Sequence, residues 1–133
     1  MATKEELRRQ IDALDQELLT LLNRRQTLAQ QIGLIKNQEG ARTLDFRREE
    51  EVLAQLLHQN PGPLSHTALR NIFREIISAA REIQTPLGVA FLGPEATFSH
   101  LAALKKFGHA SRFGPMATIR EVFSEVEKGK FHY

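Results

Sequence analysis

The sequence predicts a mainly α-helical protein followed by an incomplete α/β segment, and two observations support this fold class. Over the first 38 residues, apolar positions recur at alternating intervals of four and three, the heptad spacing of a long helix that packs lengthwise on other helices. After Pro86, short strand-like apolar runs alternate with short helical patterns, which is typical of α/β structure. We therefore expect two domains, at residues 1–85 and 86–133.

The N-terminal helix is predicted to run from about residue 4 to residue 37. Thr3 can cap its first turn, and Glu6 completes a capping box. Such a helix would be about 50 Å long, more than one small chain can cover along its whole apolar face, so we expect a dimer. The heptad seam consists of Leu7, Ile11, Leu14, Leu18, Leu21, Arg25, Leu28, Ile32 and Ile35.

Two shorter helices are predicted next. Gly40, within NQEGARTL at 37–44, interrupts the heptad pattern, and a second helix runs from about Asp45 to Gln59 before NPGP at 60–63 stops it. Ser65 can cap a third helix that ends before Thr85-Pro86.

The residues after Pro86 contain the β-α-β-α opening of a larger domain. GVAFLG at 88–93 is a strand, and TFSHLAALKKFG is a helix with Gly108 as its C-cap. A weak strand and a helix in TIREVFSEVEKG, at 118–129, follow. So short a segment buries too little surface to complete such a domain. We expect it to be a fragment that packs poorly by itself.

The composition limits the class of protein. The chain has 133 residues, 41% of them hydrophobic, and its 18 Lys and Arg face 16 Asp and Glu, which is typical of a globular protein. It has no cysteine, so disulfides and thiolate chemistry are excluded. No apolar run approaches the roughly 20 residues of a membrane span, and the N-terminus lacks the apolar stretch of a signal peptide. We expect a cytoplasmic protein that binds no membrane.

One position of the heptad seam holds a charged residue, Arg25. The simplest interpretation is a side chain that snorkels or fixes the register of a coiled coil. Lys36 lies roughly 20° from the same helix face and about 16 Å further along the axis. Since Ala29 and Ile32 between them are shorter, the two long side chains can converge. They are therefore candidates for holding a small anion.

Further polar candidates lie on the second and third helices. Asp45, Arg48 and Glu49 share a rough face at the start of the second helix. A solvated first turn explains the two acids, which the helix dipole favours, better than it explains Arg48. Gln84 shares a face of the third helix with Ala80, and by itself it is most simply a surface amide.

Arg8 cannot serve the same small ligand as Arg25 within one chain, because about 25 Å of helix separates them. In an antiparallel dimer, Arg8 of one chain could reach the site of the other. No nucleophile with a base accompanies these cations, so we expect any chemistry to come from orientation and electrostatics on a compact polyanion. No metal-ligand spacing occurs among His58, His66, His100, His109 and His132.

Three stretches keep the residues and spacing of a known family: LRRQIDALDQELLTLLNRRQTLAQQIGLIK, LDFRREEEVL and LRNIFREIISAAREIQ. Through them, residues 4–85 resemble the all-helical chorismate mutases. The resemblance implies a three-helix protomer in an intertwined dimer with two equivalent sites. It also implies the conversion of chorismate to prephenate by a one-step intramolecular rearrangement without a cofactor.

The resemblance implies roles for the cations. Arg25 and, from the partner chain, Arg8 would clamp the two substrate carboxylates, and Arg48 would hold the same end of the ligand. Lys36 and Gln84 would donate hydrogen bonds to the ether oxygen as its bond to carbon breaks.

It also implies roles for the remaining candidates. Glu49, with Asp45 as a further candidate, would hold the ring hydroxyl. The family often has serine where this chain has Ala80, which removes a possible hydroxyl contact to the substrate. A glutamate at position 84 would need its proton to donate, whereas Gln84 predicts activity without loss near neutral pH.

The stretch GVAFLGPEATFSHLAALKKFG resembles the opening of the prephenate dehydratases, over residues 87–133. That family often has glycine in place of Ala96, and Thr97 and Ser99 would lie in a loop facing its substrate cleft. Its Thr-Arg-Phe catalytic segment and amino-acid-sensing domain are not found in this sequence. The resemblance implies a bifunctional parent of phenylalanine biosynthesis, and we expect this chain to have mutase activity but no dehydratase activity.

Two other functions compete with this interpretation. A non-catalytic helical dimerisation module explains the heptads but leaves Arg25 and Lys36 on a buried line unexplained. A nucleic-acid-binding helical protein is suggested by the pI of 9.2 and by the basic clusters RR at 8–9, 24–25 and 47–48. It is disfavoured by the acids beside each basic cluster, so we expect chorismate, a second copy of the chain and no nucleic acid as partners.

Overall fold

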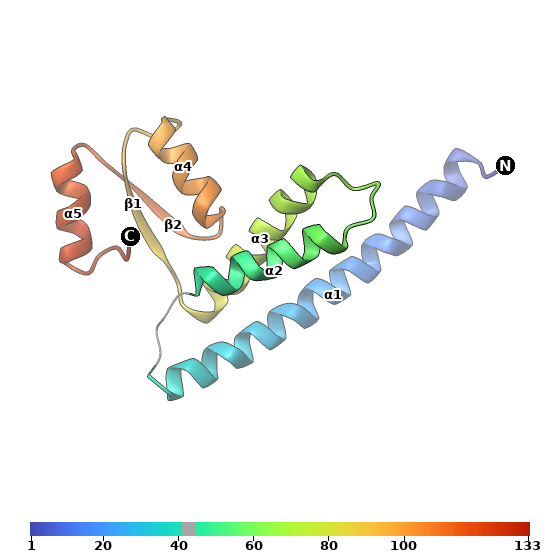
Figure 1. The fold of residues 1–133 in the computed structure, drawn as a ribbon, viewed down its shortest axis with the longest axis horizontal. Helices are drawn as coiled ribbons and strands as arrows, with labels where there is room; N and C mark the ends of the chain where they lie inside the picture. The colour runs from blue at the N-terminus through green and yellow to red at the C-terminus, as the bar shows by residue number, and fades with distance from the viewer. Residues whose placement is uncertain (41–44) are drawn as a thin grey trace.

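The protein is mainly helical, as predicted, and a computed structural model describes residues 1–40 and 45–133 (Figure 1). Within these residues no helix is both long and apolar enough to cross a membrane. Five helices and two strands are described, in the order α1 (Lys4–Gln38), α2 (Phe46–Gln59), α3 (His66–Gln84), β1 (Gly88–Leu92), α4 (Phe98–Phe107), β2 (Arg112–Met116) and α5 (Ile119–Glu127).

The predicted helix caps are confirmed. The Thr3 hydroxyl accepts a hydrogen bond from the Glu6 N–H, and the Glu6 carboxylate accepts one from the Thr3 N–H, at 2.8 Å. Asp45 is the N-cap of α2, so this helix begins one residue later than predicted. Ser65 caps α3 and Gly108 caps α4. The predicted interruption at 37–44 is described only as far as Gly40, and residues 41–44 lie outside the described residues.

α1 is much longer than α3, the helix it packs against. Its C-terminal half lies along α3, while its N-terminal half projects past the ends of α2 and α3 (Figure 1). Gly33 lets the two helices approach, because a Cβ there would lie 3.0 Å from the Gln84 Cα. In the projecting half, the apolar seam is about half exposed, with Leu14 at 55% and Leu18 at 56%.

The C-terminal segment is a small α/β unit. β1 and β2 are parallel neighbours, from the pair Gly88–Arg112 to the pair Leu92–Met116. The weak strand in the sequence is therefore β2. A small core of Leu87, Val89, Phe91 and Ala103 forms on this sheet. Phe98, Ile119 and Phe123 stay exposed, so the segment buries only part of its apolar surface.

Aromatic and polar contacts join this α/β segment to the helices. Phe46, at the start of α2, meets Phe107 and Tyr133 edge-on, with ring centroids 5.8 and 5.9 Å apart. Glu75 of α3 accepts hydrogen bonds from the backbone N–H and the ring of His109. Burial raises the pKa of Glu75, but the His109 hydrogen bonds and the charges of His109 and Arg74 outweigh it, so the pKa lies below its ordinary value of 4.5.

Candidate functional site

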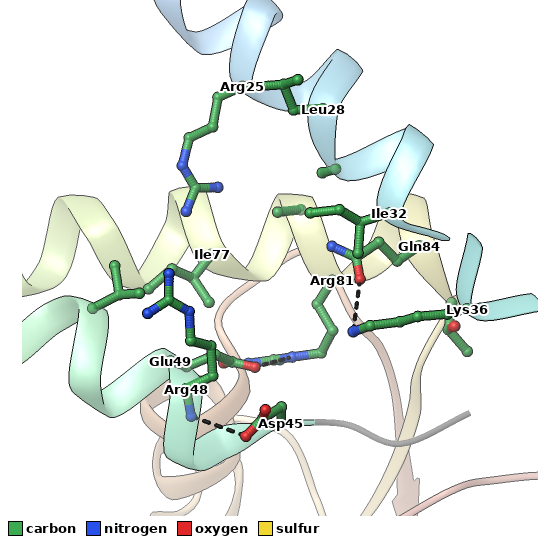
Figure 2. A pocket seen from close by; sticks show the side chains of 14 residues that line it. Arg25, Leu28, Ile32, Lys36, Asp45, Arg48, Glu49, Ile77, Arg81 and Gln84 are labelled. Atoms are coloured by element: carbon green, nitrogen blue, oxygen red, sulfur yellow. Dashed lines mark hydrogen bonds and ion pairs between the residues drawn. The ribbon is translucent and has the colours of Figure 1, made fainter. Parts of the chain in front are cut away.

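A cavity of about 480 Å³ lies between α1, α2 and α3, and it contains most of the residues that the sequence singled out (Figure 2). α1 contributes residues of its C-terminal half, among them the seam residues Arg25, Leu28 and Ile32, α2 contributes its first turns, and α3 its last turns. The cavity is lined by Arg25, Leu28, Ala29, Ile32, Lys36, Asp45, Arg48, Glu49, Val52, Ile77, Ala80, Arg81, Gln84 and Thr85.

Lys36 and Gln84 form a hydrogen-bonded pair at one end of the cavity. The Lys36 Nζ donates to the Gln84 Oε1 at 3.2 Å. Because an ammonium group can only donate, the amide oxygen of Gln84 must face Lys36. The amide nitrogen is thereby turned away from Lys36, as Figure 2 shows, and keeps its N–H donors for a ligand. This pair presents two kinds of donor to one small region.

Arg25 and Arg48 point toward the same space from opposite walls of the cavity, one from α1 and one from α2 (Figure 2). The carboxylate of Asp45 also faces this region, but its Oδ1 accepts the backbone N–H of Arg48 at 3.0 Å as the helix cap. Asp45 therefore has a structural role at the start of α2, whatever it contributes to binding.

Glu49 is held by Arg81, a residue that the sequence interpretation did not select. The Arg81 Nε donates to the Glu49 Oε2 at 3.2 Å, and its Nη2 donates to the other carboxylate oxygen. Arg81 is 7% exposed. A signal for it was present, because Ile77, Ala80, Arg81 and Gln84 have the spacing of one helix face. A charge on that inward face is as unusual as Arg25 on the heptad seam.

The charges of the cavity favour an anionic ligand. Arg81 and Glu49 neutralise each other, so among the described lining residues Arg25, Lys36 and Arg48 face one further carboxylate, that of Asp45. Apart from Gln84 and Thr85, the remaining lining is apolar, which strengthens each charge–charge interaction by lowering the local dielectric constant. The arrangement can hold a compact dianion in one conformation and donate hydrogen bonds to a third polar atom.

Four other sequence candidates are placed as follows. Ala80 is buried and lines the cavity, so its methyl group stands where a serine hydroxyl would face the ligand. Arg8 is exposed on the projecting half of α1 and does not line the cavity of its own chain. Thr97 is the N-cap of α4, and Ser99 lies in the first turn of that helix, both in the α/β segment.

The backbone conformation of the neighbouring Ala96 explains why the prephenate dehydratases often have glycine at this position. Its φ is +63°, in the left-handed region where a Cβ is disfavoured. Position 96 is therefore one where backbone conformation selects the residue.

The fold and the cavity together define a helical protein with a cation-lined cavity and an α/β extension. Residues 7–85 match the family model of chorismate mutase type II, and residues 89–133 match that of prephenate dehydratase. The chain belongs to the chorismate mutase type II family, since that model covers more than half of it.

Several curated relatives are similar over nearly the whole chain, and each is called a bifunctional chorismate mutase/prephenate dehydratase. The relative from Aquifex aeolicus is 42% identical over 137 residues, covering 100% of this chain and 38% of the relative. That from Pseudomonas aeruginosa is 43% identical, covering 96% of this chain and 36% of the relative. That from Stutzerimonas stutzeri is 41% identical with the same coverage. This chain thus spans little more than a third of the length of these relatives.

Proposed function

We propose that this chain is a chorismate mutase that rearranges chorismate to prephenate in aromatic amino acid biosynthesis. The observation that carries the proposal is the Lys36–Gln84 donor pair in one cavity with Arg25 and Arg48. Membership of the chorismate mutase type II family supports it. We further propose that residues 1–85 are the mutase domain and that residues 86–133 belong to a prephenate dehydratase domain, in keeping with the two family matches.

The reaction needs no covalent participation by the protein. Chorismate carries two carboxylates, and its ether C–O bond breaks as a new carbon–carbon bond forms within the same molecule. Arg25 and Arg48 would bind carboxylates and favour the compact conformer in which the reacting carbons meet. Glu49 would accept a hydrogen bond from the ring hydroxyl, because a carboxylate paired with an arginine retains free lone pairs.

Charge development explains the position of the donor pair. As the C–O bond lengthens, negative charge grows on the ether oxygen. The Lys36 ammonium and the Gln84 amide N–H groups would donate to that oxygen, and their hydrogen bonds would strengthen toward the transition state. This differential binding is the source of the rate acceleration in the proposed mechanism.

We propose that the working form is an intertwined homodimer, with Arg8 supplied to each cavity by the partner chain. The half-exposed seam on the projecting part of α1 supports this proposal, since a second copy would cover it. The position of Arg8, remote from the cavity of its own chain, also supports it. A cytoplasmic location remains a prediction from the sequence.

The first test is the loss of chorismate absorbance on adding the purified chain, beside the variant Arg25→Ala. We expect rapid loss with the natural chain and a decrease in kcat/KM on the order of 10²-fold in the variant, because a charge-assisted contact to the substrate disappears. Arg24→Ala is the matched control, since Arg24 is an exposed neighbour that does not line the cavity. No turnover by a folded natural chain would contradict the proposal and favour a non-catalytic dimerisation module.

A further inference from the structure

Arg81 lies between the cavity and the α/β segment and contacts both. On the cavity side its guanidinium holds both carboxylate oxygens of Glu49 (Figure 2). On the other side its Nη1 donates to the backbone carbonyl of Phe107, at the last residue of α4, at 3.0 Å. The same side chain therefore links α2, α3 and α4.

The surroundings of Arg81 explain why an arginine occupies this place. Its guanidinium carbon lies 5.2 Å from the centroid of the Phe46 ring and 6.0 Å from that of Phe107. A buried charge is costly unless its donors find partners, and here Glu49 and the Phe107 carbonyl supply them. The planar fork of arginine matches a carboxylate on two of its donors, which a lysine cannot do.

The contact with Glu49 fixes a side chain that the substrate would meet. The Glu49 side chain is only 22% exposed, and it lines the same cavity as Arg48 and Lys36. If Arg81 were absent, the Glu49 carboxylate would lose both of its side-chain donors and could turn toward other cations: Arg48 and Lys36 in this cavity, or Lys105 and Lys106 in a neighbouring pocket that Glu49 also lines. In the first case it would neutralise groups that bind the dianion, and in either case it would leave the orientation in which it faces the substrate.

We propose that Arg81 is a positioning residue that holds Glu49 in its binding orientation, and that the end of α4 holds Arg81 in turn. This inference rests on the proposed mutase function. It makes the α/β segment a support for the helical cavity, through one guanidinium group and the Phe107 carbonyl. A function for Arg81 in global stability alone is the competing explanation.

Gly108 connects this support to the packing of α4 on α3. Its φ is +75°, which only glycine adopts readily, and a Cβ there would collide with the side chain of Ser78. An alanine at this position would push the end of α4, and with it the Phe107 carbonyl, away from Arg81. Gly129 also has a positive φ, +79°, but a Cβ there would meet nothing within 4 Å.

The test is a double-mutant cycle on chorismate turnover with Arg81→Met and Glu49→Gln. We expect Arg81→Met to lower kcat/KM by at least ~10-fold in the natural background, because a misplaced contact group commonly costs this much or more. In the Glu49→Gln background the same change is expected to cost less than ~3-fold, since the group that Arg81 positions is already altered. Arg81→Lys is expected to restore part of the loss. An equal cost of Arg81→Met in both backgrounds, or no cost in the natural one, would overturn the proposal.

Two controls separate positioning from general destabilisation. His109→Ala removes another link between α3 and the α/β segment, and it is expected to lower the melting temperature while leaving kcat/KM within ~2-fold. Gly108→Ala is expected to lower kcat/KM, whereas Gly129→Ala, which also places a Cβ at a positive φ but in open space, is not. Equal losses of activity in Gly108→Ala and Gly129→Ala would overturn the support by α4. So would a loss in His109→Ala equal to that in Arg81→Met.

A third measurement keeps this proposal distinct from the mutase assignment. The same cycle, followed by urea unfolding, reports the coupling of Arg81 and Glu49 without any substrate. Absence of chorismate turnover in the natural chain would refute the mutase function and, with it, the role of Arg81 in turnover. A strong coupling of Arg81 and Glu49 in urea unfolding would still support the structural link between these two residues. Turnover without coupling in either cycle would refute the positioning proposal alone.

Discussion

At the scale of single residues, the amide of Gln84 decides how activity depends on pH. Its oxygen accepts from Lys36 and its nitrogen remains a donor at every pH at which the protein is folded. A carboxylic acid at this position would donate only while protonated, and the adjacent Lys36 would favour the ionised form. The natural chain should therefore show no loss of kcat/KM between about pH 5 and pH 7.

The variant Gln84→Glu tests this role. We expect its kcat/KM at pH 7 to fall on the order of 10²-fold below that of the natural chain and to recover as the pH is lowered toward ~4.5, because the donor returns with the proton. The measurement is a pH–rate profile of both proteins. Gln55→Glu, at an exposed position of α2, is the control and should keep the natural profile. A steep fall of the natural chain between pH 5 and 7 would contradict the role of Gln84.

Charged residues on apolar helix faces were the most informative signals at this scale. Arg25 stood out because the heptad seam is long and regular, and the structure places it in the cavity. Arg81 has the same relation to the inward face of α3, but that face is shorter and its pattern is less regular. The salt bridge with Glu49 also depends on how α2 packs against α3, so the spacing on one helix could not reveal its partner.

At the scale of elements, the close approach of α1 and α3 determines where Lys36 and Gln84 meet. Gly33 is buried at the contact, and an added Cβ would lie 3.0 Å from the Gln84 Cα and 3.3 Å from its Cβ and Cγ. Such contacts are tighter than ordinary packing, so α3 would have to move by a few tenths of an ångström. Gly33 therefore determines how the donor pair of Lys36 and Gln84 is placed, although it forms no hydrogen bond with their side chains.

We expect Gly33→Ala to lower kcat/KM by ~10-fold or more while changing stability by less than ~1 kcal/mol. The activity falls because the donor pair shifts. Stability changes little because the higher helix propensity of alanine, worth up to about 1 kcal/mol, offsets the crowding. Chorismate turnover and thermal unfolding measure the two effects. Gln31→Ala, on an exposed face of α1, should leave turnover unchanged. Full activity of Gly33→Ala would show that the approach of the helices is not critical.

Helices and their caps were predictable because their causes are local. The Thr3 capping box, the Ser65 cap and the Gly108 C-cap each involve residues within a few positions of one another. The one-residue difference at the start of α2 has the same origin, since Asp45 caps the helix instead of beginning it. The close approach at Gly33 was not predictable, because a glycine within a helix does not say which other helix it meets.

At the scale of the whole molecule, the contact between the helical and α/β parts could not be predicted from the sequence patterns. Phe46, Phe107 and Tyr133 are far apart along the chain and have no shared periodicity, yet their rings pack together. Each could equally have been assigned to the core of its own unit. Long-range packing of this kind is what makes Arg81 a link between the two parts.

The proposed dimer predicts that two inactive variants can restore each other. In a mixed dimer of Arg8→Ala and Arg25→Ala chains, one cavity combines the intact Arg25 of the first chain with the intact Arg8 of the second, while the other cavity lacks both. Random exchange gives mixed dimers as half of the total, so about a quarter of the natural activity should appear after the two variants are unfolded together and refolded.

A matched mixture identifies the source of any recovery. Arg25 and Arg48 line the cavity of one chain, so mixed dimers of Arg25→Ala and Arg48→Ala have no intact cavity and should stay inactive. Mixing separately refolded Arg8→Ala and Arg25→Ala, without exchange, should also give no recovery. If the exchanged Arg8→Ala and Arg25→Ala mixture is no more active than its parts, Arg8 does not cross to the partner. The exposed seam of α1 would then require another explanation than a shared active site.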